Sequence, residues 1–160
     1  MRRPARCGAQ CAGFTLLELL VVMVIVGIML GVVSFNAMPG ERQVLQTEAQ
    51  RVALLLQLAR DEAIVRNRPI AFEANTEGFR FLLRDANTWQ LLASDDLLRE
   101  RAFRRSPVNL AIAPVAAGEG NPMRIVFGRE PVDRPFVLTM SLGDASVLIR
   151  ADGIGHFSVE

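Results

Sequence analysis

One stretch of the chain, residues 14–38, constrains the fold more than any other. It is predominantly apolar over 25 residues and contains a single charged side chain, Glu18. A helix of that length, at about 1.5 Å per residue, spans roughly 37 Å, which exceeds a bilayer hydrocarbon core of about 30 Å. The stretch therefore predicts a transmembrane helix.

The acid in this stretch and the bases before it carry functional information. A carboxylate costs about 2.5 kcal/mol or more at mid-membrane, so Glu18 needs a partner or a pathway and is the first candidate functional residue. Arg2, Arg3 and Arg6 precede the stretch, and residues 1–13 contain no acid. By the positive-inside rule we expect a single pass with a cytoplasmic N-terminus and an exported C-terminal part.

Two other interpretations of the same stretch remain open. A secretory signal peptide also has a basic start, but its apolar region is usually shorter and an A-x-A cleavage site follows it. Here the stretch ends in the sequence SFNAMP, residues 34–39, without such a site. A plain single-pass anchor would tolerate Glu18 if its side chain reached the interface.

The sequence GFTLLE, residues 13–18, resembles the processing site of type IV pilin-like precursors. The resemblance implies that a prepilin peptidase removes a leader, residues 1–13, by cutting between Gly13 and Phe14 on the cytoplasmic side. It also implies methylation of the new Phe14 amine. Glu18 becomes the fifth mature residue, and in this family it pairs with the N-terminal amine of a neighbouring subunit during filament assembly.

The chemistry of such a pairing is reasonable. A free α-amine has a pKa of about 7.7–8.0, and methylation leaves it able to stay protonated, so the amine and the Glu18 carboxylate could neutralise each other. Gly27 and Gly31 lie four residues apart and form a small-xxx-small face on which another helix could pack closely. Glycine is common in membrane helices in any case, so packing and simple composition both remain possible.

Removal of the leader would change the composition of the chain. Both cysteines, Cys7 and Cys11, lie in the leader, so the mature chain would contain no thiol and no disulfide framework. Loss of three of the 18 arginines leaves 15 bases against 17 acids, a formal charge of −2. The balance does not indicate a general binder of polyanions.

An amphipathic pattern follows Pro39 and predicts a helix over residues 39–68 that continues into the exported domain and stops before Pro69. Apolar residues recur at steps of four and three. They are Leu45, Ala49, Val52, Leu56, Ala59 and Ala63. We expect this stripe to pack on the C-terminal domain of the same chain; a seam to neighbouring subunits is the alternative.

Short apolar runs separated by turn residues fill residues 69–160 and predict a periplasmic, mostly antiparallel β-sandwich-like domain. The fold class is therefore α+β, with a long N-terminal hydrophobic and amphipathic helix before the β domain. A loop is expected over 113–122. The predicted strands are 70–72, 79–82, 88–93, 108–113, 123–127, 135–142, 146–150 and 154–159.

Within the pilin-like group the chain resembles the GspH minor pseudopilins of type II secretion systems. The resemblance lies in residues 55–63, 78–82, 89–90 and 124–127. It implies a subunit near the tip of a periplasmic pseudopilus, anchored in the bacterial inner membrane. The implied partners are other minor and major pseudopilins, the prepilin peptidase and methyltransferase, and the inner-membrane assembly platform. Many relatives have a proline-x-glycine turn where this chain has residues 128–131.

An enzymatic function finds little support in the residue inventory. His156 is the sole histidine, and on a predicted strand it is better explained as a packed or solvent-facing side chain. Neither H-E-x-x-H nor C-x-x-C spacing occurs, and Asp95 and Asp96 lack the remaining residues of a calcium loop. We expect no catalytic residue, no metal and no cofactor.

The alternative function is that of a type IV pilus minor pilin of the FimT type, which shares this domain type and takes part in pilus assembly or DNA uptake. The one basic cluster consists of Arg99, Arg101, Arg104 and Arg105, with Phe103 as its aromatic residue. A solvated edge strand, protected by charge against pairing with another sheet, explains the cluster without DNA. Nucleic acid is therefore not the expected partner.

Overall fold

The computed structural model describes residues 15–36, 40–93, 95–114 and 122–160. The chain forms two compact units, residues 1–39 and 40–160, and each is described by itself. The predicted loop over 113–122 lies mostly outside the described residues.

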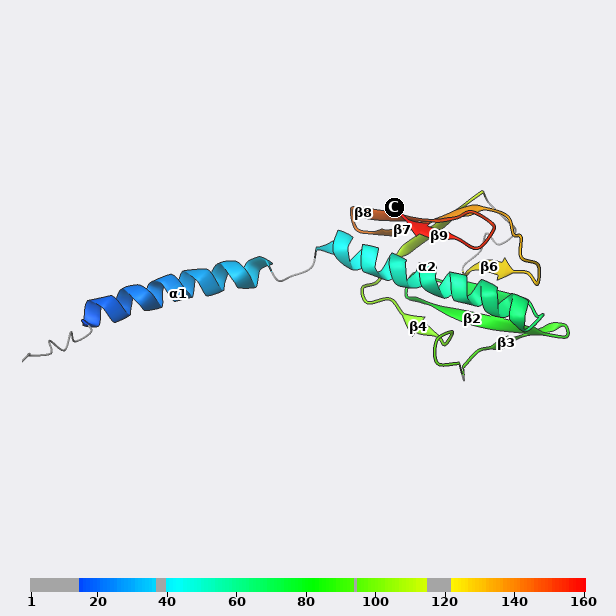
Figure 1. Ribbon diagram of the computed structural model, residues 1–160, viewed down its shortest axis with the longest axis horizontal. Coiled ribbons are helices and arrows are strands. Elements are labelled where there is room, and N and C mark those ends of the chain that lie inside the picture. The colour runs from blue at the N-terminus through cyan, green and yellow to red at the C-terminus, as the bar shows by residue number, and fades with distance from the viewer. Residues whose placement is uncertain (1–14, 37–39, 94, 115–121) are drawn as a thin grey trace, which may run out of the picture. The chain divides into compact units, whose positions relative to one another are not determined.

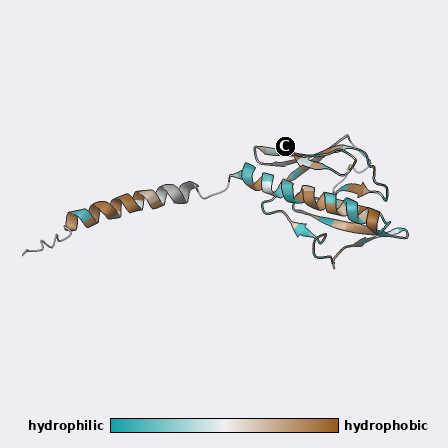
Figure 2. Ribbon diagram, in the orientation of Figure 1, coloured by the Kyte–Doolittle hydropathy of each residue, from teal (hydrophilic) through white to brown (hydrophobic). Residues whose placement is uncertain are grey.

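Helix α1 (Leu16–Asn36) forms the described part of the first unit. The helix begins after Thr15, whose hydroxyl oxygen accepts the backbone N–H of Glu18 at 3.2 Å. A threonine cap followed three residues later by glutamate is a capping-box sequence, so the start of α1 is set locally. Figure 2 shows hydrophobic residues along this helix.

The predicted membrane segment, residues 14–38, has both of its ends outside the described residues. Among the helices that the structure describes, none is both long and apolar enough to cross a membrane.

Helix α2 (Glu41–Val65) opens the second unit and confirms the predicted stripe. All six stripe residues are at most 1% exposed, and they pack in one hydrophobic cluster with residues from the strands. The stripe therefore packs on the domain of its own chain, as expected.

The helix ends three residues before the predicted end. Asn67 adopts a left-handed conformation with φ of 52°, and the N–H of Arg68 reaches back to the carbonyl of Ala63 at 3.0 Å. Asparagine tolerates this conformation better than most residues, and the turn satisfies carbonyls at the helix end. The local conformation of Asn67 therefore ends α2 before Pro69 is reached.

In the described part of the chain, nine strands form two antiparallel sheets, which confirms the predicted α+β class. Sheet A has the order β3-β2-β1-β6, and β4 also pairs with β2; sheet B has the order β5-β7-β8-β9. The strands of sheet A are β1 (Ile70–Ala74), β2 (Gly78–Asp85), β3 (Thr88–Leu91), β4 (Arg101–Ala102) and β6 (Met123–Phe127). Those of sheet B are β5 (Asn109–Ala113), β7 (Phe136–Leu142), β8 (Ala145–Ala151) and β9 (Phe157–Val159).

Helix α2 joins the two sheets. It contacts β1 and β6 of sheet A and β7, β8 and β9 of sheet B, and Figure 1 shows it between the two sets of strands. Phe72, Phe79 and Phe81 of sheet A contribute a group of rings whose centroids lie 5.4–6.0 Å apart. One core thus includes the helix and both sheets.

The last predicted strand is shorter than expected, because a turn occupies residues 152–156. A single carboxylate oxygen of Asp152 accepts the N–H groups of Ile154 at 2.9 Å and His156 at 3.0 Å. Gly153 and Gly155 have positive φ angles, which a strand does not allow. The prediction that His156 lies on a strand is therefore wrong; this residue is in the turn before β9.

Replacement of Leu56 by alanine tests whether α2 supports the core. Leu56 is fully buried, so we expect Leu56→Ala to lower the free energy of unfolding by about 2–5 kcal/mol. The matched control is Leu54→Ala on the same helix, because Leu54 is 68% exposed; its effect should stay within about 0.5 kcal/mol. Urea unfolding in mild detergent, monitored by the fluorescence of the single tryptophan, measures the free energy of unfolding of both variants. Equal losses would contradict the packing described.

Candidate functional site

The predicted processing residues, Gly13 and Phe14, lie outside the described residues. Glu18 is described, in the first turn of α1, and its side chain is exposed. A carboxylate at this position interacts favourably with the helix dipole, and it follows the Thr15 cap at capping-box spacing. No described residue forms a salt bridge with it. Glu18 thus occupies a position that the helix dipole and the capping-box sequence both favour for an acid.

The described surface of α1 is apolar and exposed. Thirteen large hydrophobic side chains between Leu16 and Leu30 are 44–82% exposed, and they lie on all sides of the helix. A helix that is hydrophobic all round is normally buried in lipid or among other helices. This surface therefore calls for an apolar environment.

Gly27 and Gly31 lie in the same helix. A Cβ atom added at either position would meet nothing within 4 Å. No described residue lies against the pair, so their role in helix packing stays a prediction.

Among the described residues of the second unit, three charged side chains are buried, and sequence reasoning found none of them. They are Glu48, Arg60 and Glu73. A buried charge is tolerated when it is paired and hydrogen-bonded, so each marks a contact that holds segments together.

Glu48 of α2 binds the backbone of the basic cluster. Its carboxylate pairs with Arg51 at 2.9 Å and accepts the backbone N–H of Arg104 at 3.2 Å. Phe103, the residue before Arg104, is buried, and the centroid of its ring lies 5.5 Å from that of Phe79, with the two rings tilted. The aromatic residue of the basic cluster is therefore part of the core and is not free to stack on a nucleic-acid base.

Arg60 holds the loop that follows β6. Its guanidinium donates to the carbonyl of Pro131 and pairs with Asp61 at 3.2 Å. A Cβ at Gly155 would lie 2.3 Å from Arg60 Nη1, so the glycine leaves room for the buried group. Burial raises the pKa of the nearby Asp133, although the Arg60 charge opposes the rise. Arg60 therefore holds residues 128–131, the segment in which many relatives have a proline-x-glycine turn.

Glu73 lies at the centre of sheet A, on β1. The strand register places it between Arg80 on β2 and Arg124 on β6. Arg80 Nε donates to one carboxylate oxygen at 2.8 Å, and Arg124 Nε donates to the other at 2.8 Å. Burial alone would raise the pKa of Glu73, but hydrogen bonds from both arginines and their charges hold it below its usual value. Pairing depends on strand register, which the sequence pattern does not specify.

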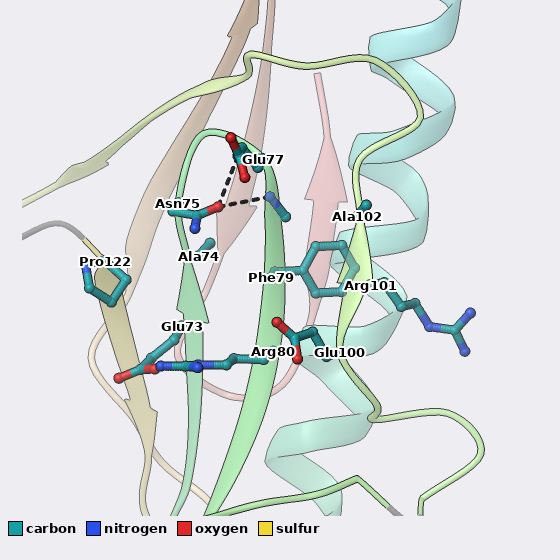
Figure 3. Close-up of a pocket in the computed structure, with 11 residues that line it drawn as sticks. Glu73, Ala74, Asn75, Glu77, Phe79, Arg80, Glu100, Arg101, Ala102 and Pro122 are labelled. Carbon is teal, nitrogen blue, oxygen red and sulfur yellow. Dashed lines mark hydrogen bonds and ion pairs between the residues drawn. The ribbon is translucent and has the colours of Figure 1, made fainter.

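A groove lies between the β1–β2 hairpin and β4 (Figure 3). In the hairpin turn the side-chain oxygen of Asn75 accepts the N–H groups of Glu77 and Gly78 at 2.8 and 2.9 Å. A Cβ at Gly78 would lie 2.5 Å from the carbonyl oxygen of Arg101, so β4 approaches this closely because position 78 is glycine. Among the described residues no group of three or more His, Cys, Asp or Glu side chains could hold a metal ion.

Comparison with known families decides the assignment. Residues 48–155 match the family described as Type II transport protein GspH, and residues 8–34 match the prokaryotic N-terminal methylation motif. The chain belongs to the GspH family. The predicted resemblance to a GspH-type minor pseudopilin is thereby confirmed.

Individual relatives agree with this assignment. Type II secretion system protein H of Aeromonas hydrophila is 32% identical over 171 aligned positions, covering 91% of each chain. The protein of the same name from Pseudomonas aeruginosa is 29% identical over 138 positions, covering 84% of this chain and 78% of that one. The minor pseudopilin EpsH of Vibrio cholerae has the same fold, with a TM-score of 0.56 and 20% identity over 72% of this chain and 95% of that one.

Membership in the GspH family has two direct consequences. A pseudopilin with an N-terminal methylation motif is a protein anchored in the inner membrane, and a GspH subunit interacts with other pseudopilins.

The Glu73 ion pairs predict a specific acid sensitivity. Because the folded-state pKa of Glu73 is lowered, its pairs stabilise the fold fully above the usual glutamate pKa of about 4.3. This contribution is lost as the pH falls through the folded-state value. Glu73→Gln should lower the free energy of unfolding at pH 7 by about 1–3 kcal/mol and flatten its dependence on pH below 4.3.

The exposed hairpin residue Glu77 supplies the control, since Glu77→Gln removes the same charge from a solvated position. Urea unfolding from pH 7 down to about pH 3, below the unperturbed glutamate pKa, measures both variants. An unchanged pH slope in Glu73→Gln would show that the pairs do not stabilise the fold.

Proposed function

We propose that this chain is a minor pseudopilin that assembles near the tip of a type II secretion pseudopilus and helps to drive folded proteins across the outer membrane. The membership in the GspH family and the methylation motif support the secretion role. The position near the tip rests on the resemblance to minor pseudopilins. The role is structural, and no catalytic step is assigned to the chain itself.

In this proposal the leader, residues 1–13, is removed between Gly13 and Phe14 by a prepilin peptidase, and the Phe14 amine is methylated. The apolar segment 14–38 then holds the chain in the inner membrane, with the domain from Gly40 onward in the periplasm. The arginines of the leader support this orientation, because positive charge is retained on the cytoplasmic side.

The exposed apolar surface of α1 is the observation that carries the proposal. Before assembly this surface would be covered by lipid, and in a filament it would be covered by the helices of other subunits, so one surface serves both states. Glu18 is the one charge on it, and its pairing with the Phe14 amine of a neighbour would offset part of the cost of burying the two groups.

Assembly needs energy that this chain does not supply. The sequence contains no G-x-x-x-x-G-K-[ST] loop, so nucleotide hydrolysis belongs to another component. We infer that the inner-membrane assembly platform, driven by a cytoplasmic ATPase, extracts the subunits, and that the growing filament pushes exoproteins through an outer-membrane channel.

Substitution of Glu18 tests this function. In cells with the mutant as the only copy, Glu18→Ala should leave membrane insertion intact and reduce both secretion and incorporation into filaments. Glu18→Gln is the sharper variant, because glutamine keeps the capping-box sequence after Thr15 and removes the charge alone. We expect it to reduce secretion as strongly as alanine does.

Glu41→Gln is the matched control, since Glu41 occupies the first turn of α2 and its loss changes the net charge equally. Normal secretion with Glu18→Gln as the only copy would contradict the assembly role of the charge. The same filaments, labelled with antibody against residues 40–160, test the position: label at one end agrees with a tip subunit, and label along the length argues against it.

A further inference from the structure

The outer face of sheet A, opposite the core, carries an ordered layer of arginine and tryptophan side chains. Residues directly opposite one another in the register share a face, so this face comprises positions from all four main strands of the sheet. We name it the Trp89 face, formed by Ala71, Glu73, Arg80, Leu82, Arg84, Trp89, Leu91, Arg124 and Val126.

The layer holds itself together. The guanidinium carbons of Arg84 and Arg124 lie 5.5 and 5.6 Å from the centroid of the Trp89 ring, which is cation–π distance. Arg124 also donates to Glu73, and Arg80 donates to the same carboxylate. Glu73 is 3% exposed beneath these side chains. The arginines are therefore fixed in place before any partner arrives.

The same arginines keep unused hydrogen-bond donors. Within the described residues, Arg80 Nη1 and Nη2 and Arg124 Nη1 have no partner, and Arg84 bonds only through Nη2, to Asn87 at 3.2 Å. Three arginines against one buried acid give the face a formal charge of +2, whereas the chain from residue 14 onward carries −2. Leu91 and Val126 on this face are more than 40% exposed. The positive charge is thus a local property of this surface.

We propose that the Trp89 face is a docking surface for an acidic segment of a partner protein. Carboxylates of the partner bind Arg80, Arg84 and Arg124, and its apolar side chains cover Leu91 and Val126. Guanidinium groups match carboxylates with two parallel hydrogen bonds, and tryptophan and arginine are enriched where binding energy concentrates. Because the layer is already ordered, little side-chain entropy is lost on binding.

Protein carboxylates fit this face better than nucleic acid does. Single-stranded nucleic acid binds through aromatic rings on which bases stack. Two guanidinium groups already occupy the surroundings of the Trp89 ring, and Phe103 is buried in the core. The groups that this face offers are mainly hydrogen-bond donors, and its one aromatic side chain, Trp89, is half-buried.

The face also has a defined end. Beyond Arg80 the groove of Figure 3 contains Glu77 and Glu100, whose charges would repel an acidic segment. The segment therefore lies toward Trp89 and Leu91. This assignment goes beyond the pseudopilus role, which names no surface of the exported domain, and does not depend on it.

The test is titration of the purified full chain, in a non-ionic detergent, with an acetylated peptide of alternating glutamate and alanine. We expect saturable binding that Arg84→Gln weakens about tenfold, the effect of losing one charge-assisted contact. Arg84 makes no bond to Glu73, so this variant leaves the buried carboxylate paired. Arg84→Lys keeps the charge and loses the planar fork, and it should bind with intermediate affinity.

Arg105→Gln is the matched control, an exposed arginine outside the face, and it should bind as the unmodified chain does. If Arg105→Gln weakened peptide binding as much as Arg84→Gln does, binding would reflect general charge attraction, and the proposal would be overturned. Absence of saturable binding to the unmodified chain would also overturn it. So would tighter binding to a single-stranded oligonucleotide or to phosphatidylglycerol vesicles that Arg84→Gln weakens, since the occupant would then be nucleic acid or lipid.

Discussion

The apolar stripe of α2 is the constraint on which the rest of the exported domain depends. Each sheet has one apolar face, and the helix lies against both, so its six small and medium side chains close one core from two sides. Alanine at positions 49, 59 and 63 is fully buried in this core. This packing positions the two sheets relative to the helix.

Buried charge then fixes the irregular segments that the core leaves loose. Glu48 holds the segment after β4, Arg60 holds the loop after β6, and Glu73 organises the outer face of sheet A. Each pairs with a group distant in sequence, and removal of one partner would leave an unpaired charge in a dry environment. The contacts of Glu48 and Arg60 therefore specify the conformation of loops that hydrophobic burial alone would not determine, and those of Glu73 link three strands of sheet A.

Patterns among neighbouring residues predicted much of this fold, whereas contacts between residues distant in sequence were not predicted. The stripe of α2 and the strands around Phe72 and Phe81 follow from periodicity, which depends only on neighbours in sequence. The end of α2 depends on the conformation of Asn67, and the start of β9 depends on the turn that Asp152 holds. Both boundaries therefore differ from those predicted. The pairing of Glu73 with two arginines requires the register of three strands, which the sequence alone does not give.

We propose that the exposed apolar helix belongs to a processed filament subunit and not to a plain anchor. The hydrogen bond from the Glu18 N–H to Thr15 suits both a filament subunit and a plain anchor, so the N-terminal residue of the native protein distinguishes them. Intact-mass analysis of the protein from its native membrane, with fragmentation of the N-terminal peptide, identifies it directly. We expect a chain that begins at methylated Phe14; a chain that retains residues 2–13 would show that the helix is a plain anchor.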